Sequence, residues 1–117
     1  MNLKEYKVQV ALGLISYGDK CKIAVNTNVI KLLEYLSRNK DVAIKYAVAK
    51  NINTPVKILG YLSKDKNNII RYWVAENKNT PVEILRILSK DKDYYTKNKA
   101  KERLGEIIWT WKSIKYK

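Results

Sequence analysis

The sequence predicts an all-α solenoid built from short helix pairs, because three stretches repeat one another at a spacing of 26 residues. A period between about 20 and 50 residues is typical of stacked repeats, in which each unit buries its apolar face only against its neighbours. Two columns of leucine and one of serine share this spacing: Leu33, Leu59 and Leu85; Leu36, Leu62 and Leu88; Ser37, Ser63 and Ser89. We therefore expect one domain over residues 1–117, divided into an N-terminal cap and partial repeat (1–25), three repeats (26–51, 52–77 and 78–103) and a C-terminal capping helix (104–117).

The first helix of each repeat is expected to start near Asn28, Thr54 or Thr80. Thr54 is a favourable N-cap, and Pro55 suits the first helical position, where its missing N–H costs nothing. In the third repeat, Thr80 and Glu83 have the spacing of a capping box. The helix of the second repeat should stop near residues 63–64, with a wide apolar face at spacings of three made by Val56, Ile58, Leu59, Tyr61 and Leu62.

A second helix should follow in each repeat, capped by Asn39, Asp65 or Asp91. It should end near Asn51 in the first repeat and near Glu76 in the second. In the third repeat its apolar pattern is lost, as expected for a terminal unit with one face open to water. The replacing residues are Thr96, Lys97, Asn98 and Lys99.

The ends of the chain are expected to be caps. Residues 6–17 predict a helix that breaks at Gly18 and Asp19, and residues 21–26 resemble a shortened second helix of the repeat. Spacing places Trp111 on the apolar face of a closing helix and Trp109 off that face, so we expect Trp111 to pack in the core and Trp109 to be exposed. The other apolar residues of this closing helix are Leu104, Ile107, Ile108 and Ile114.

The second repeat resembles the variant leucine-rich repeat, a HEAT-like family of bacterial helical solenoids. The matching residues are the start Thr54-Pro55, the core Leu59 and Leu62, the loop residue Asp65, the pair Ile70-Arg71 and the end Val74-Ala75-Glu76-Asn77. The match covers residues 53–91 closely and residues 28–51 well, and it is lost after about residue 100. The resemblance implies a right-handed superhelix that binds proteins or nucleic acids, but it does not name a ligand.

Some relatives of this family carry an iron–sulfur cluster on a cysteine-rich segment. This chain has a single cysteine, Cys21, and no histidine, so we expect no cofactor and no metal. The same composition excludes the usual nucleophilic triads, and no carboxylates are paired at a spacing that suggests a shared proton. We therefore expect a protein that is not an enzyme. A related HEAT-like group excises alkylated bases from DNA, and a reduced DNA-repair glycosylase is kept as a third alternative.

The net charge of +13 at pH 7 indicates a polyanionic partner. An A/T-rich genome would also supply lysine, asparagine, isoleucine and tyrosine, so codon usage remains an alternative explanation for part of the charge. The lone cysteine suits a reducing compartment, and no signal peptide or apolar run long enough to cross a bilayer is found, so we expect a cytoplasmic protein.

Three columns of basic residues recur at the repeat spacing and are the candidate nucleic-acid-binding residues: Arg38, Lys64 and Lys90; Lys40, Lys66 and Lys92; Lys45, Arg71 and Lys97. Stacked repeats would bring each column together on one surface, where it could follow a phosphate backbone. The alternative for Arg71 is an ion pair with Asp65 or Asp91 that ties repeats together, and for the other two columns it is a solvated turn.

Aromatic residues offer possible stacking platforms for bases, although Tyr35 and Tyr61 also fit the edge of the core. The set comprises Tyr35, Tyr46, Tyr61, Tyr72, Trp73, Tyr94 and Tyr95. The sequence thus predicts a non-catalytic binding module for DNA or RNA phosphates without sequence specificity, or for an acidic protein. The alternative is a protein–protein scaffold that uses the solenoid groove. The oligomeric state is left open.

Overall fold

The computed structural model describes residues 1–115, which form eight α-helices and no strand, so the all-α prediction is confirmed. The helices are α1 Leu3–Ala11, α2 Tyr17–Asn26, α3 Ile30–Ser37, α4 Val42–Lys50, α5 Val56–Leu62, α6 Asn68–Glu76, α7 Val82–Leu88 and α8 Tyr94–Lys115.

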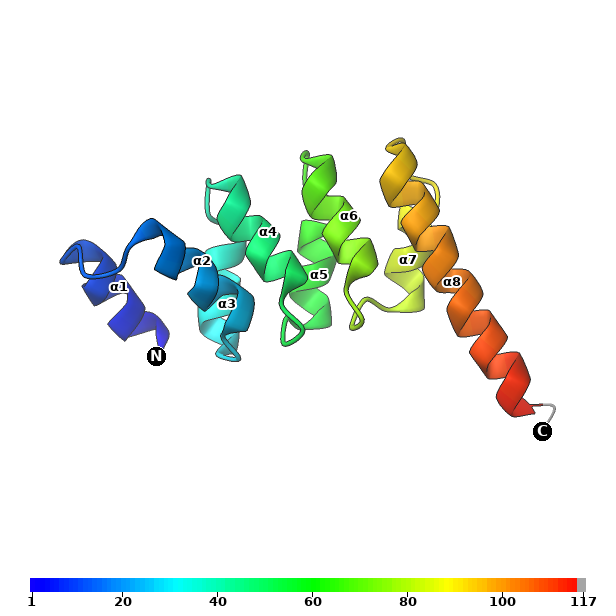
Figure 1. Cartoon of the computed structure of the whole chain (residues 1–117), viewed down its shortest axis with the longest axis horizontal. Helices are drawn as coiled ribbons and strands as arrows, with labels where there is room; N and C mark the ends of the chain where they lie inside the picture. Colours follow the sequence, from blue (N-terminus) through cyan, green and yellow to red (C-terminus); the bar gives the residue numbers. More distant parts are fainter. Residues whose placement is uncertain (116–117) are drawn as a thin grey trace.

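The helices lie in two rows, visible in Figure 1. In one row α2, α4, α6 and α8 pack against one another in that order, and in the other α3 packs between α1 and α5. The pairs α3–α4, α5–α6 and α7–α8 link the rows. Because packing follows chain order, the molecule is elongated, measuring 57 × 32 × 20 Å.

The repeated leucines form the core between the two rows. Leu33, Leu59 and Leu85 are fully buried, and the second leucine column, residues 36, 62 and 88, is buried as well. The expected helix ends also agree with the structure in the first two repeats. Helix α5 ends at residue 62, and α4 and α6 end immediately before Asn51 and Asn77.

The predicted caps of the first helices are wrong. Thr54 and Thr80 are buried, and their hydroxyls donate to the carbonyls of Val48 and Val74, at 2.6 and 2.5 Å. Val48 and Val74 lie in the last turns of α4 and α6. Each threonine hydroxyl therefore satisfies a backbone carbonyl that the following loop buries. The cap positions are taken by the residues that follow, Val29, Pro55 and Pro81, and none of these caps has a side-chain hydrogen bond. The capping box of Glu83 and the Asn28 cap therefore do not form.

The N-terminal segment contains two helices, as predicted, but their bounds differ from the predicted 6–17 and 21–26. Helix α1 ends at Ala11, and Gly13 follows with a φ of 70°, a left-handed conformation that glycine adopts without strain. Ser16 then caps α2 by accepting a hydrogen bond from the N–H of Asp19, which places Gly18 inside a helix instead of at a break. Helix α2 has 10 residues and packs on α4 as a full member of its row, so it is not shortened.

The C-terminal segment is one helix where the sequence predicts two. Helix α8 runs through 22 residues, and buried Thr96 and Ala100 occupy the places of Ile70 and Val74 in α6. No proline interrupts this helix, because Ile107 stands in the column of Pro55 and Pro81. The last two residues of the predicted segment 104–117 lie outside the described part of the chain.

Helix α8 contains two tryptophans, and the expected burial of one of them is wrong. Trp111 is 58% exposed, so its predicted place in the core is wrong, whereas Trp109 is 70% exposed, as predicted. The C-terminal end of α8 extends past the two rows of helices (Figure 1), and within residues 1–115 only α8 itself lines the surface beside Trp111.

Candidate functional site

The loops that join the two helices of each pair lie along one edge of the molecule, at the N-terminal ends of α4, α6 and α8 (Figure 1). We call loops 38–41, 64–67 and 90–93 the loop edge. Two of the three predicted basic columns lie on it, and all six of their side chains are exposed: Arg38, Lys40, Lys64, Lys66, Lys90 and Lys92. Within residues 1–115, none of the six forms an ion pair.

Each loop begins with the same turn, in which a side-chain oxygen accepts a hydrogen bond from the N–H two residues later. Asn39, Asp65 and Asp91 accept at 2.8, 2.9 and 2.8 Å. Such turns are a common use of asparagine and aspartate. These residues therefore do not cap the second helices as predicted, and the loops instead share one conformation that fixes the spacing of the flanking lysines.

The second helices are capped two residues further on, by a second column of short polar side chains. Asp41 accepts from the N–H of Ala43, Asn67 from that of Ile69, and Asp93 from that of Thr96 (2.8, 2.8 and 2.9 Å). The sequence contained this signal, because residues 41, 67 and 93 also stand 26 apart.

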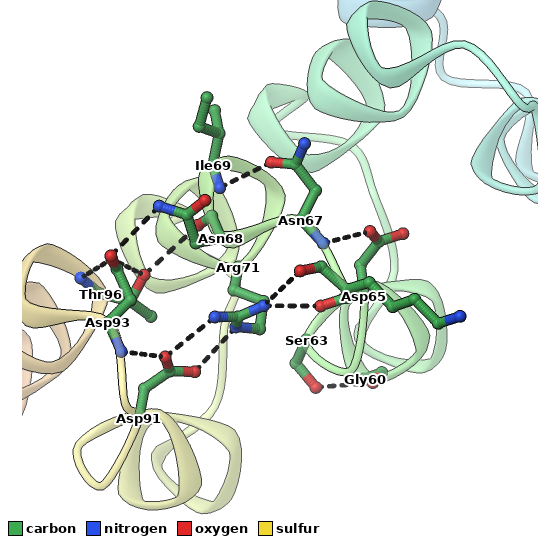
Figure 2. A network of polar contacts seen from close by, with 11 residues as sticks. Gly60, Ser63, Asp65, Asn67, Asn68, Ile69, Arg71, Asp91, Asp93 and Thr96 are labelled. Atoms are coloured by element: carbon green, nitrogen blue, oxygen red, sulfur yellow. Dashed lines mark hydrogen bonds and ion pairs between the residues drawn. The ribbon is translucent and has the colours of Figure 1, made fainter.

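The third basic column is largely engaged within the protein. The Arg71 guanidinium binds the Asp91 carboxylate through Nε and Nη2 at 2.9 and 3.1 Å, and its Nη1 donates to the carbonyls of Asp65 and Lys66 at 2.8 and 3.0 Å. Figure 2 shows this guanidinium between the two loops. Lys45 makes the equivalent but simpler contact with Asp65, at 2.7 Å. The pairing expected for Arg71 is thus present, and it joins loop 64–67 to loop 90–93.

The last member of this column differs from the other two. Lys97 has no ion pair among residues 1–115, and the carboxylate that the repeat would supply falls at position 117, which is a lysine. Of the nine candidate residues, the structure therefore places six together on the loop edge, commits Lys45 and Arg71 to structural ion pairs, and leaves Lys97 partly buried beside them.

Two carboxylates of the loop edge are held in their charged form. Burial alone would raise the pKa of Asp65, but the hydrogen bonds from Lys45 and from the N–H of Asn67, with the charge of Arg71, outweigh it and lower the pKa. The N–H and hydroxyl of Thr96 lower the pKa of Asp93. Asp65 and Asp91 are neutralised by their cations, so positive charge remains in excess along the loop edge.

A ladder of amide and guanidinium groups, which the sequence analysis missed, runs along the opposite edge. The Asn51 amide donates to the carbonyls of residues 24 and 27, and the Asn77 amide to those of residues 49 and 51, at 2.8–3.0 Å. Arg103 stands 26 residues further on and donates to the carbonyls of residues 75, 76 and 77. The column could have been found from its spacing. It satisfies the carbonyls at the end of each preceding helix and is structural.

Three of the seven candidate aromatic residues are held by packing. Tyr46 and Tyr72 each meet Trp73 edge-on, with ring centroids 5.3 and 5.6 Å apart, and all three are partly buried on the face of α4 and α6. Tyr94 and Tyr95 are different: they start α8 directly beside the loop edge and are 66% and 70% exposed. On the α3–α5 row, Tyr35 and Tyr61 are about half exposed rather than buried.

An open groove of about 500 Å³ lies on the α1, α3 and α5 side. Its lining mixes apolar and charged side chains, including Leu3, Ile58, Tyr61, Lys31, Glu34 and Arg38. The Arg38 guanidinium lies 5.2 Å from the Tyr61 ring centroid, so this groove meets the loop edge at Arg38.

Groups that would hold a metal were also sought. Among residues 1–115 there is no cluster of three or more histidine, cysteine, aspartate or glutamate side chains placed to bind an ion. Over the same residues, no helix is both long enough and apolar enough to pass through a bilayer.

The chain was compared with protein families, with curated proteins and with solved structures. None of the three comparisons finds a match.

Proposed function

We propose that the protein is a non-catalytic binding module, a right-handed HEAT-like solenoid whose loop edge binds the phosphates of DNA or RNA without sequence specificity. One observation carries this proposal: six exposed lysine and arginine side chains, free of ion pairs within residues 1–115, recur on three loops of the same conformation.

The spacing and chemistry of these side chains suit a phosphate backbone. Packed helices lie about 8–10 Å apart, so successive loops present charge at roughly that interval. Phosphates are closer together than this, so a nucleic-acid strand can meet each loop without a fixed register. Five of the six side chains are lysines, which act as point charges, whereas base reading in the major groove relies more on bidentate arginine. Weak sequence discrimination follows.

The test is a mobility-shift assay on random-sequence duplex and single-stranded DNA and RNA at several salt concentrations. Replacing Lys40, Lys66 and Lys92 together by Gln should weaken binding equally on all sequences and flatten the salt slope by up to about three units. The matched control replaces three exposed lysines away from the loop edge by Gln, which changes the net charge equally: Lys22, Lys78 and Lys101. This control should retain most of the slope.

A second candidate function is a protein–protein scaffold that uses the groove between α1, α3 and α5. Its mixed lining, with half-exposed tyrosines beside charged side chains, suits a peptide segment better than a phosphate chain. Salt separates the two functions, because an apolar groove contact responds little to salt whereas phosphate binding falls steeply. If the wild-type protein shifts no DNA or RNA at low salt, the nucleic-acid proposal is wrong and the scaffold takes its place.

A further inference from the structure

The C-terminal part of α8 projects beyond the other helices (Figure 1). Ala100 is the last fully buried residue of the helix, and Leu104 and Ile107 still lie partly buried against the core. Beyond them, four large apolar side chains are between 52% and 72% exposed: Ile108, Trp109, Trp111 and Ile114. Large contiguous apolar patches are rare on the surface of monomeric proteins and mark sites of interaction, so we expect this segment to bind a partner.

Three of these exposed side chains, Ile108, Trp111 and Ile114, lie on or beside one face of the helix, and Trp109 lies off it. Residues 104, 107, 111 and 114 follow spacings of three and four, which place them along one side of a helix, and residue 108 adjoins them. An open hollow of about 450 Å³ runs beside Ile107, Trp111 and Ile114, and its lining comes entirely from α8. We call residues 104–115 the α8 overhang. Leu104 and Ile107 at its start pack partly against the core, and further along, within residues 1–115, no other helix covers Trp111 or Ile114.

The charge of the α8 overhang selects among possible partners. The α8 overhang contains one acidic residue, Glu106, which also lines the hollow, and two lysines, Lys112 and Lys115. The Lys115 ammonium lies 4.8 Å from the Trp111 ring centroid. A second copy would bring two bodies of charge +13 together over about three helical turns, an area below that of a stable dimer. Nucleic acid offers phosphates and bases but no hydrocarbon for three isoleucines. An anionic lipid surface offers both hydrocarbon and negative charge.

We propose that the α8 overhang binds the surface of an anionic lipid bilayer. The helix lies in the plane of the interface, with Ile107, Trp111 and Ile114 at the boundary between headgroups and acyl chains and with Lys112 reaching the lipid phosphates. Tryptophan is suited to this depth because its ring is apolar and its N–H is polar. The projection of the helix keeps the repeats clear of the membrane. This proposal does not depend on nucleic-acid binding by the loop edge.

The test uses the full-length protein and two kinds of vesicle, pure phosphatidylcholine and an equal mixture of phosphatidylcholine and phosphatidylglycerol. Co-sedimentation measures binding, and tryptophan fluorescence reports burial. A Trp73→Phe background leaves only the two tryptophans of the α8 overhang to emit. We expect binding to the anionic vesicles and a shift of the emission to shorter wavelength, with much weaker binding to the neutral ones.

Variants identify the residues responsible. Trp111→Ser with Ile114→Ser should weaken binding about tenfold or more through lost apolar burial, and Lys112→Gln about fivefold on anionic vesicles only. Ile87→Ser is the matched control, because Ile87 is an isoleucine that is 66% exposed elsewhere, on α7; it should bind as the wild type does. Circular dichroism confirms that each variant is folded.

Three results would overturn the proposal: no binding to the anionic vesicles, binding without a change in emission, or equal weakening by Ile87→Ser. A dimer in sedimentation equilibrium that is lost in the Trp111→Ser, Ile114→Ser variant would also overturn it and would assign the face to a second copy. The variant with Lys40, Lys66 and Lys92 replaced by Gln should keep the emission shift at saturating lipid. A failure of lipid binding by the α8 overhang can therefore be distinguished from a failure of nucleic-acid binding by the loop edge.

Discussion

The column of Lys45, Arg71 and Lys97 allows one substitution to be made at three equivalent places that differ only in their contacts. Arg71 makes four hydrogen bonds, two of them to the Asp91 carboxylate, with both side chains about one-tenth exposed. Lys45 makes one ion pair at somewhat greater exposure, and Lys97 makes none within residues 1–115. Substitution by Met keeps an unbranched apolar stem and removes the charge at each position.

The expected losses of folding free energy follow the contacts. Arg71→Met leaves a largely buried carboxylate unpaired and two carbonyls without their donor, so it should cost about 3–5 kcal/mol. Lys45→Met should cost about 1–2 kcal/mol, because its ion pair is single and less buried. Lys97→Met should change stability by less than about 0.5 kcal/mol.

Urea unfolding followed by circular dichroism at the helix band measures these differences. With a slope of about 1–3 kcal/mol per molar urea, Arg71→Met should lower the midpoint by about 2 M. Adding Asp91→Asn should recover part of the loss, because the amide removes the unpaired charge and keeps the oxygen that accepts from the Asp93 N–H. Equal losses at positions 45, 71 and 97, or no recovery in the double variant, would refute this account of how repeats are joined.

Three further predictions concern stability. Asn77→Ala removes three hydrogen bonds at a residue that is 5% exposed and should cost about 2–4 kcal/mol in urea unfolding, whereas Asn26→Ala, at an exposed site, should cost about 0.5 kcal/mol or less. Leu59→Ala should cost about 2–5 kcal/mol, and Leu3→Ala, at a partly buried site in α1, clearly less. Because the folded-state pKa of Asp65 lies below its ordinary value of 3.8, its stabilising contribution is complete above that pH and is lost as the pH falls further; Asp65→Asn should reduce the slope of stability against pH in this range.

Each of these predictions has a result that would count against it. Equal midpoints for Asn77→Ala and Asn26→Ala would mean that the amide ladder does not stabilise the repeats. Similar losses for the two leucine variants would contradict the packing between the helix rows. An unchanged acid slope in Asp65→Asn would show that the carboxylate is no better stabilised in the folded protein than in the unfolded chain.

The sequence alone determined the parts of this protein that repeat. The leucine columns recur at one spacing and predicted the buried positions. The turn residues predicted helix ends near residues 63–64, 76 and 51, and the helices end at residues 62, 76 and 50. The pairing of Arg71 with an aspartate was likewise accessible, because the loop residues Asp65 and Asp91 recur at the same spacing as the basic column. The two basic columns of the loop edge could be predicted from the sequence because they also recur every 26 residues. That they bind phosphates is a proposal.

Only the tertiary structure decided which polar side chain satisfies which backbone group. The local sequence of Thr54 favours an N-cap. Its hydroxyl instead donates to the Val48 carbonyl, because that acceptor becomes buried when the loop folds back. The ends depended on the same kind of information. Local spacing cannot tell that Arg103 reaches the carbonyls of α6, or that α8 continues past its last neighbour and leaves Trp111 uncovered, because burial depends on what other helices supply.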